Sequence, residues 1–294
     1  MISALASTAS FQDLLGWHPH YEVWAMMLAG LAIYALLVAR WGESSVEPGE
    51  KPVSRLQVGC FLGGMSALWI GASWPIHDMA EQYLFSVHMF QHLIFSLVGA
   101  PLILLGIPHW MARRVLGPKP VMFIMKKLTR PIPALLLFNG YLVISHSPAF
   151  VDAVLVNHPL HFLAHAGLFF TAIIMWWPVF SPLPEIARIS NPAQMLYLFG
   201  QTIVPTVPAS FLTFGETPMY AFYIKAPRLF AGFSALADQR IAGLTMKLFG
   251  GFLLWGVIAV LFFRWSSKEE KGTPDEVEWQ DLELKVNQSG QTGP

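Results

Sequence analysis

The chain has 294 residues, of which 18 are Lys or Arg and 18 are Asp or Glu, so its formal net charge is zero. Hydrophobic residues make up 54% of it and charged residues only 12%, whereas a soluble domain usually carries about 25% charged residues. The composition therefore excludes an ordinary soluble domain and predicts a polytopic membrane protein with no nucleic-acid partner.

Seven hydrophobic segments read as membrane-spanning helices, which predicts an all-α helix bundle in the membrane. In chain order they cover residues 22–40, 56–74, 84–106, 132–147, 160–180, 194–214 and 241–263. Each is about 16–23 residues long, enough to cross a hydrocarbon core of about 30 Å with modest tilt or with some burial by neighbours.

Lysine and arginine are distributed unevenly between the two sets of loops. Fourteen lie around the loops that follow the first, third and fifth spans or in the C-terminal region, against three on the other side. Because cytoplasmic loops are enriched in these residues, we expect the N-terminus outside and the C-terminus in the cytoplasm. This divides the chain into an extracytoplasmic segment (1–21), a seven-helix transmembrane domain (22–264) and a flexible cytoplasmic tail (265–294). With no Lys or Arg before Arg40, a cleavable signal peptide is not expected.

The sequence offers no catalytic constellation. A single cysteine, Cys60, excludes an internal disulfide framework and a CxxC motif. The chain also has no Walker loop, no GxGxxG and no credible Ser/His/Asp arrangement. We therefore expect a protein that is not an enzyme.

Histidine is the most informative residue type. By this topology nine of the ten histidines lie outside or in the outer half of the membrane: His18, His20, His77, His88, His92, His146, His158, His161 and His165. His88 and His92 are four apart, which places both on one helix face. His158, His161 and His165 follow a similar single stripe on a later helix. Since ionisable side chains inside a membrane are candidates for function, we predict a metal site where the two histidine-bearing faces meet.

The surrounding residues indicate which metals would suit the site. Imidazole binds copper, zinc, iron and nickel, and thioether sulfur favours copper(I). Methionines on the outer side by this topology are Met79, Met89, Met219 and Met246, and acidic residues that would orient a ligating imidazole are Asp78, Glu81 and Asp238.

Other interpretations remain open at this point. Paired histidines also hydrogen-bond between membrane helices without a metal. His92 and His165 would serve as axial ligands in a haem b electron-transfer protein. A copper permease would need further ligands across the membrane, for which Gln201, Asn139 and Cys60 are the main candidates. His18, His20 and His77 are expected to be surface residues, and His109 to be structural.

Four segments resemble the CtaG-like cytochrome c oxidase assembly factor family, which are seven-span bacterial membrane proteins. They are HMFQHLIFSLVGAPLILLG (His88–Gly106), SHSPAF (Ser145–Phe150), HPLHFLAHAGLFFTAIIMWWPV (His158–Val179) and DQRIAGLTMKLFGG (Asp238–Gly251). The resemblance covers about residues 20–264. It implies a multi-pass protein of the bacterial cytoplasmic (inner) membrane that supports maturation of a haem–copper oxidase by handling copper.

The resemblance also implies a set of site residues and partners. The family pattern maps onto His88, His92, His146, His161, His165, Asp238 and Met246 as metal-site residues, with copper as the bound metal. Expected partners are cytochrome c oxidase subunits, the lipid bilayer, another copper chaperone and a second copy of the chain. One departure is visible, because Ala164 stands where the family usually has an acidic residue before the last histidine. Any role of that acid in orienting a ligand is lost here or taken by another residue.

Overall fold

The computed structural model describes residues 16–272, and within that range the chain is helical and has no β-strand. In chain order the α-helices are α2 (Tyr21–Trp41), α3 (Arg55–Gly71), α4 (Ile76–Gln82), α5 (Phe85–Leu93), α6 (Ala100–Gly106), α7 (His109–Leu116), α8 (Lys119–Leu128), α9 (Pro131–Ser145), α10 (Pro148–Leu155), α11 (His158–Phe180), α12 (Asn191–Phe214), α13 (Ala221–Lys225), α14 (Ala235–Leu244) and α15 (Gly250–Gly272). The predicted all-α class is confirmed.

Several helical segments are long and apolar enough to cross a membrane. Five pass by themselves: Tyr21–Trp41, Phe85–Gly106, His158–Phe180, Asn191–Phe214 and Ala235–Glu270. Two bent pairs, α3 with α4 (45°) and α9 with α10 (72°), raise the number to as many as seven if each pair is one span. By length and composition the protein thus has five to seven candidate spans.

The C-terminal helix is longer than the sequence analysis predicted. The tail was expected from residue 265, but α15 continues to Gly272. Contacts one turn apart support this extension, since Trp265 Nε1 donates to Glu269 Oε1 at 3.0 Å and Ser266 Oγ to Glu270 Oε1 at 3.4 Å. The rest of the predicted tail, 273–294, and residues 1–15 of the N-terminal segment lie outside the described residues.

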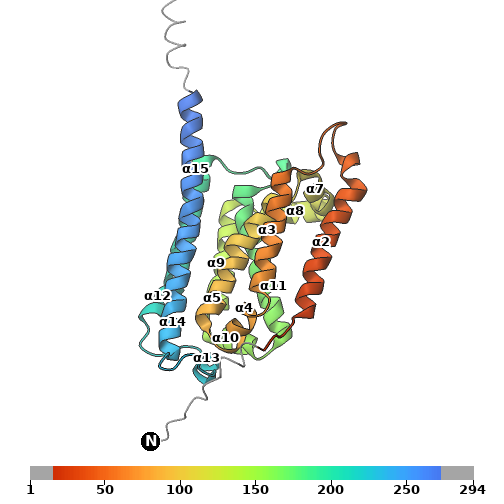
Figure 1. The fold of residues 1–294 in the computed structure, drawn as a ribbon. Helices are drawn as coiled ribbons and strands as arrows, with labels where there is room; N and C mark the ends of the chain where they lie inside the picture. Colours follow the sequence, from red (N-terminus) through yellow and green to blue (C-terminus); the bar gives the residue numbers. More distant parts are fainter. Residues whose placement is uncertain (1–15, 273–294) are drawn as a thin grey trace, which may run out of the picture.

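Large apolar side chains of α11 fill the centre of the bundle. Met175 and Trp176 are buried there together with Leu198 of α12. Trp176 Nε1 also donates to the carbonyl of Ser96 at 2.9 Å, which fixes α11 against the span that carries His88 and His92. Helix α2 stands at the edge, with Met27 as its buried residue, and packs against α3 (Figure 1).

Glycines allow the closest helix contacts. A Cβ on Gly106 would lie 2.7 Å from the Phe61 Cα, so α6 can approach α3 only because this side chain is absent. Likewise, a Cβ on Gly243 would lie 2.8 Å from the Ala209 carbonyl oxygen, where α14 crosses α12. These contacts set the distance between α6 and α3 and the distance between α14 and α12.

Two of the spans contain a π-helical segment. One, η2 (Ile94–Gly99), lies between α5 and α6, and the other, η4 (Thr245–Phe249), lies between α14 and α15. Short π segments inside α-helices widen one turn and are frequent at functional sites. Both segments contribute side chains to one cavity, described below.

The short helices α4, α10 and α13 gather at one end of the bundle (Figure 1). Two carboxylates cap helices there from a distance in sequence. Asp152 accepts hydrogen bonds from the first two amides of α13, at 3.2 and 2.9 Å. Asp238 accepts from the amides of Phe85 and Ser86, at 2.7 and 3.1 Å, and so caps the N-terminus of α5. The position of α5 therefore depends on α14.

Candidate metal centre

Four imidazoles from two helices converge at this end of the bundle. His88 and His92 come from α5, and His161 and His165 come from α11, one turn apart in each pair. The Nε2 atoms of His161 and His165 are 3.2 Å apart, and those of His165 and His92 are 3.1 Å apart. The ring centroid of His88 is 4.2 Å from that of His92 and 5.6 Å from that of His161. The structure thus brings together the two predicted histidine faces, and we call these four residues the histidine cluster.

The nitrogen atoms of the cluster have the spacing of a potential metal site. One nitrogen each of His88, His161 and His165 lies within 4.8 Å of the other two. Within residues 16–272 this is the one group of three or more His, Cys, Asp or Glu side chains with such a spacing. Three of the seven predicted ligands therefore have nitrogens close enough to one another for one metal ion.

Protons alone do not satisfy the three neighbouring Nε2 atoms. A neutral imidazole has one N–H and one lone pair. Because Nδ1 of His161 faces a carboxylate and carries the proton, its Nε2 offers a lone pair. Nε2 of His165 carries either one proton or one lone pair. It can therefore form a proper hydrogen bond with only one of its two neighbours, and its contact with the other neighbour is left without one. A metal ion that accepts the lone pairs would remove this conflict.

Two further nitrogens of the cluster lack a partner. Nδ1 of His88 and Nδ1 of His92 are buried and have no hydrogen-bond partner among the described residues. His88 and His161 are 5% and 4% exposed. Buried polar atoms without partners cost free energy, about 1–3 kcal/mol in protein mutational data, so the cluster is costly as a purely structural feature.

Glu81 of α4 orients the cluster. Its Oε1 accepts hydrogen bonds from Nδ1 of His161 at 2.7 Å and from Nε2 of His77 at 2.9 Å. A carboxylate on the far nitrogen of a histidine fixes the tautomer and the direction of the lone pair. The sequence analysis named Glu81 as such a partner, and it supplies a carboxylate where Ala164 offers none.

A glutamine that the sequence analysis did not single out supports the same arrangement. The Gln91 amide, on α5, donates to the Gly71 carbonyl at 2.8 Å and lies 3.0 Å from Nδ1 of His77. This bond makes Nδ1 of His77 the acceptor and its Nε2 the donor toward Glu81. The available signal was a polar residue three positions after His88 in an apolar segment.

Tyr223 of α13 holds α4 in place beside the cluster. Its hydroxyl donates to the Ala80 carbonyl at 2.7 Å. Burial, together with the nearby carboxyls of Asp238 and Glu81, raises the pKa of Tyr223 well above its ordinary value. The phenol therefore keeps its proton and remains a donor next to Glu81.

His20 and His77 are not the surface residues that the sequence analysis expected. Their side chains are 18% and 15% exposed, because the segment before α2 folds against α4 and the two rings meet edge to face with centroids 4.7 Å apart. His18 is 64% exposed, as expected. His109 and His158 lie exposed at the starts of α7 and α11.

The other three predicted site residues lie beside the cluster. His146 ends α9 with its ring centroid 6.5 Å from that of His92, and its Nδ1 contacts the Leu142 carbonyl at 2.7 Å. Both carboxylate oxygens of Asp238 are used at the start of α5. Met246 is buried on η4. Ligation by these three stays a prediction.

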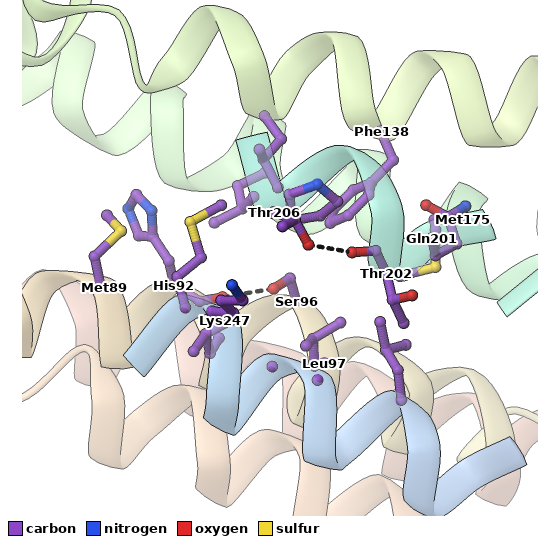
Figure 2. A pocket seen from close by; sticks show the side chains of 18 of the residues that line it. Met89, His92, Ser96, Leu97, Phe138, Met175, Gln201, Thr202, Thr206 and Lys247 are labelled. Atoms are coloured by element: carbon purple, nitrogen blue, oxygen red, sulfur yellow. Dashed lines mark hydrogen bonds between the residues drawn. The ribbon is translucent and has the colours of Figure 1, made fainter. Parts of the chain in front are cut away.

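A cavity of about 230 Å³ borders the cluster on the side of His92 and His146. Figure 2 shows side chains from several helices around it, among them Met89, His92 and Gln201. Its walls are mainly apolar, with the buried thioethers of Met89, Met175 and Met246. Three thioether sulfurs, among them that of the predicted Met246, thus line the cavity next to His92.

Comparisons with known proteins identify the family. No curated protein and no solved structure matches the chain. The family model described as cytochrome c oxidase caa3 assembly factor matches residues 32–268, a range that includes the histidine cluster, Asp238 and Met246. The resemblance found in the sequence is thereby confirmed, and the chain belongs to the cytochrome c oxidase caa3 assembly factor family.

Proposed function

We propose that this protein binds copper at the histidine cluster and delivers it to a cytochrome c oxidase during assembly. The single observation that carries the proposal is the convergence of the His92, His161 and His165 Nε2 atoms, with His165 Nε2 at 3.1 Å from that of His92 and 3.2 Å from that of His161. Imidazole nitrogens suit copper, and the thioethers lining the adjacent cavity favour copper(I). The family is one of assembly factors, which suggests a role without catalysis.

We further propose seven spans in the bacterial cytoplasmic membrane, with the N-terminus outside. The two bent helix pairs bring the candidate spans to seven, and an odd number agrees with termini on opposite sides. The basic residues of α7 and α8, such as Arg113 and Lys126, then lie on the cytoplasmic side. In this orientation the histidine cluster is near the outer surface, where an oxidase subunit would receive copper.

The cluster fits haem less well than copper. A bis-histidine haem places its two imidazoles on opposite faces of a flat macrocycle. Here the rings of His88 and His161 stand close to those of His92 and His165, with centroids 4.2–5.7 Å apart in the contacts that involve His88. The room that a macrocycle needs is filled by these rings.

A permease would require ligands beyond Gln201 and Asn139 along the apolar core.

Metal analysis of the purified protein tests the proposal. Mass spectrometry of protein in detergent should find about one tightly held copper per chain, absent from a His92→Ala/His165→Ala variant and present in the matched control His158→Ala. Cells with the double variant should assemble a smaller amount of active oxidase. Iron with a Soret band would indicate a haem protein instead, and folded protein that cannot be loaded with copper would refute copper binding.

A further inference from the structure

The cavity beside His92 opens on the flank of the bundle, between α12 and the span formed by η4 and α15 (Figure 2). Lys247, Gly251 and Trp255 line it from that span, and their spacing of four residues places them on one helix face. Lys247 is exposed and Trp255 is 50% exposed, so this face reaches the outside of the protein. A Cβ on Gly251 would meet no atom within 4 Å. The mouth of the cavity therefore lies at Gly251, between the lysine and the tryptophan.

Lys247 is a cation without a counter-charge in an apolar span. Residues 241–263 contain no other charged side chain. Lys247 also has no ion-pair partner in the part of the chain that the structure describes. It lies about 9 Å along the helix from the start of that predicted span, a depth from which a long lysine side chain reaches the lipid head groups. The phosphate of a lipid is an anion that Lys247 can pair with there.

The interior of the cavity suits a hydrocarbon chain. Its hydroxyl groups already donate to backbone carbonyls: Ser96 to His92 at 2.7 Å, Thr202 to Phe199 at 2.7 Å and Thr206 to Thr202 at 2.9 Å. The other walls are mainly apolar side chains. Since an apolar cavity of about 150 Å³ holds one benzene molecule, the volume of about 230 Å³ has room for about nine methylene groups.

Two buried nitrogens on the wall indicate that the ligand also carries polar atoms. Nδ1 of His92 and Nε2 of Gln201 have no hydrogen-bond partner among the described residues. Ligand pockets commonly combine apolar walls with a few such groups, which fix the orientation of the ligand. A phospholipid has ester carbonyls at the head of its chains, whereas an unsubstituted hydrocarbon offers no acceptor. A phospholipid therefore suits this wall better than a hydrocarbon does.

We propose that the cavity binds one anionic phospholipid from the membrane leaflet on the histidine side. Its phosphate pairs with Lys247, and one acyl chain bends past Gly251 into the cavity. The bound chain closes the side of the histidine cluster on which His92 borders the cavity. The inference goes beyond copper handling, because none of these contacts requires a metal.

Lipid titration of the full chain tests the site. Delipidated protein in detergent should retain one phosphatidylglycerol per chain in native mass spectrometry. It should bind this lipid about five-fold more tightly than phosphatidylcholine, which has no net charge, and Lys247→Gln should remove the preference. Gly251→Leu should weaken binding of both lipids by at least about ten-fold, because the new side chain displaces buried methylene groups.

Gly256→Leu is the matched control for the change at Gly251. A Cβ on Gly256 also meets no atom within 4 Å, and this residue lies on the same helix but outside the cavity lining. The control should change neither affinity. Should Gly251→Leu melt earlier than the unmodified chain, Thr202→Phe fills the cavity from α12 instead and should weaken binding in the same way.

Three results would overturn the inference. Unchanged lipid binding in the variant that fills the cavity, at an unchanged melting temperature, would exclude the cavity as the site of the acyl chain. Equal affinities of the unmodified chain for the two lipids would exclude the pairing with Lys247. Tighter binding of oleate than of phosphatidylglycerol would assign the site to a free fatty acid. The proposed copper binding would stand in each case, because it is measured separately on the histidine cluster.

Discussion

At the scale of single residues, the candidate site depends on which nitrogen of each imidazole carries the proton. Glu81 decides this for His161 by accepting from Nδ1, and Gln91 decides it for His77. The Nε2 lone pair of His161 then faces His165, and the Nε2 proton of His77 faces Glu81. The cluster is therefore pre-arranged by neighbours that are not themselves among its four rings.

Replacing Glu81 by Gln should weaken metal binding without unfolding the protein. An amide carries no charge and only one acceptor oxygen, so it orients His161 less firmly. We expect the copper affinity of the cluster to fall about 10–100-fold, the usual effect of removing a partner of a ligating histidine. Competition with a chromophoric chelator would measure it.

The exposed Glu216 provides the matched control for this change. Glu216→Gln removes the same charge outside the histidine cluster and should leave the affinity as it is. Equal affinities for Glu81→Gln and the unmodified chain, at equal melting temperature, would contradict a positioning role for Glu81.

Residue types and spacing were enough to predict the four cluster histidines, because i, i+4 pairs on two apolar helices share a face and a depth. They were not enough for His77 and Gln91. His77 lies in a predicted loop, and its contacts to Glu81 and Gln91 exist only because α4 folds back toward α5 and α11. Such contacts between separate elements have no local sequence signal.

At the scale of elements, α5 is held by a carboxylate from another span. Asp238 of α14 accepts from the first amides of α5, and Ser86 Oγ also donates to it at 2.6 Å. Hydropathy predicted the segment 84–106 well, since the structure has a candidate span from Phe85 to Gly106. It could not predict the cap, which pairs residues about 150 positions apart.

Asp238→Ala should lower both stability and copper affinity. Loss of a cap of this kind costs about 1–2 kcal/mol, and the start of α5, which carries His88, would lose its anchor. Ser54→Ala is the matched control, because it removes the N-terminal cap of α3 near α7, away from the four cluster rings. That variant should melt earlier yet bind copper normally. Thermal unfolding and copper titration of both variants would separate the two effects, and normal copper binding by Asp238→Ala would contradict the anchor role.

At the scale of the whole molecule, the two ends of the bundle differ in the charged residues that they carry. The end with α7 and α8 carries Arg113, Arg114, Lys126 and Lys127. The end with α4 and α13 carries Lys225 and Arg228, and it places Asp78 and Glu81 beside histidines. The hydrophobic segments predicted an all-helical chain correctly for residues 16–272, and the five to seven candidate spans agree with a membrane protein. The number of spans depends on how the two bent pairs sit in the bilayer, which sequence periodicity does not determine.

Cysteine labelling should confirm the proposed orientation. In a Cys60→Ser background, His158→Cys should react with a membrane-impermeant maleimide added to intact spheroplasts. Lys126→Cys should react only after lysis, because we place α8 in the cytoplasm. Both positions are exposed on the protein, so access depends on the side of the membrane. The reverse pattern would invert the topology and place the histidines on the cytoplasmic side.

The π segments η2 and η4 each let the span that contains them turn one face to its neighbours before the segment and a different face after it. An extra residue in a turn rotates everything that follows by about 100° relative to an uninterrupted α-helix. Before η2, α5 directs His88 and His92 toward α11, and after it α6 directs Gly106 toward α3. The face of α6 that packs against α3 can therefore vary independently of the face of α5 that carries the histidines. Deleting a single residue within η2 would turn either Gly106 away from α3 or the histidines away from α11, while the other part of the span stayed in place.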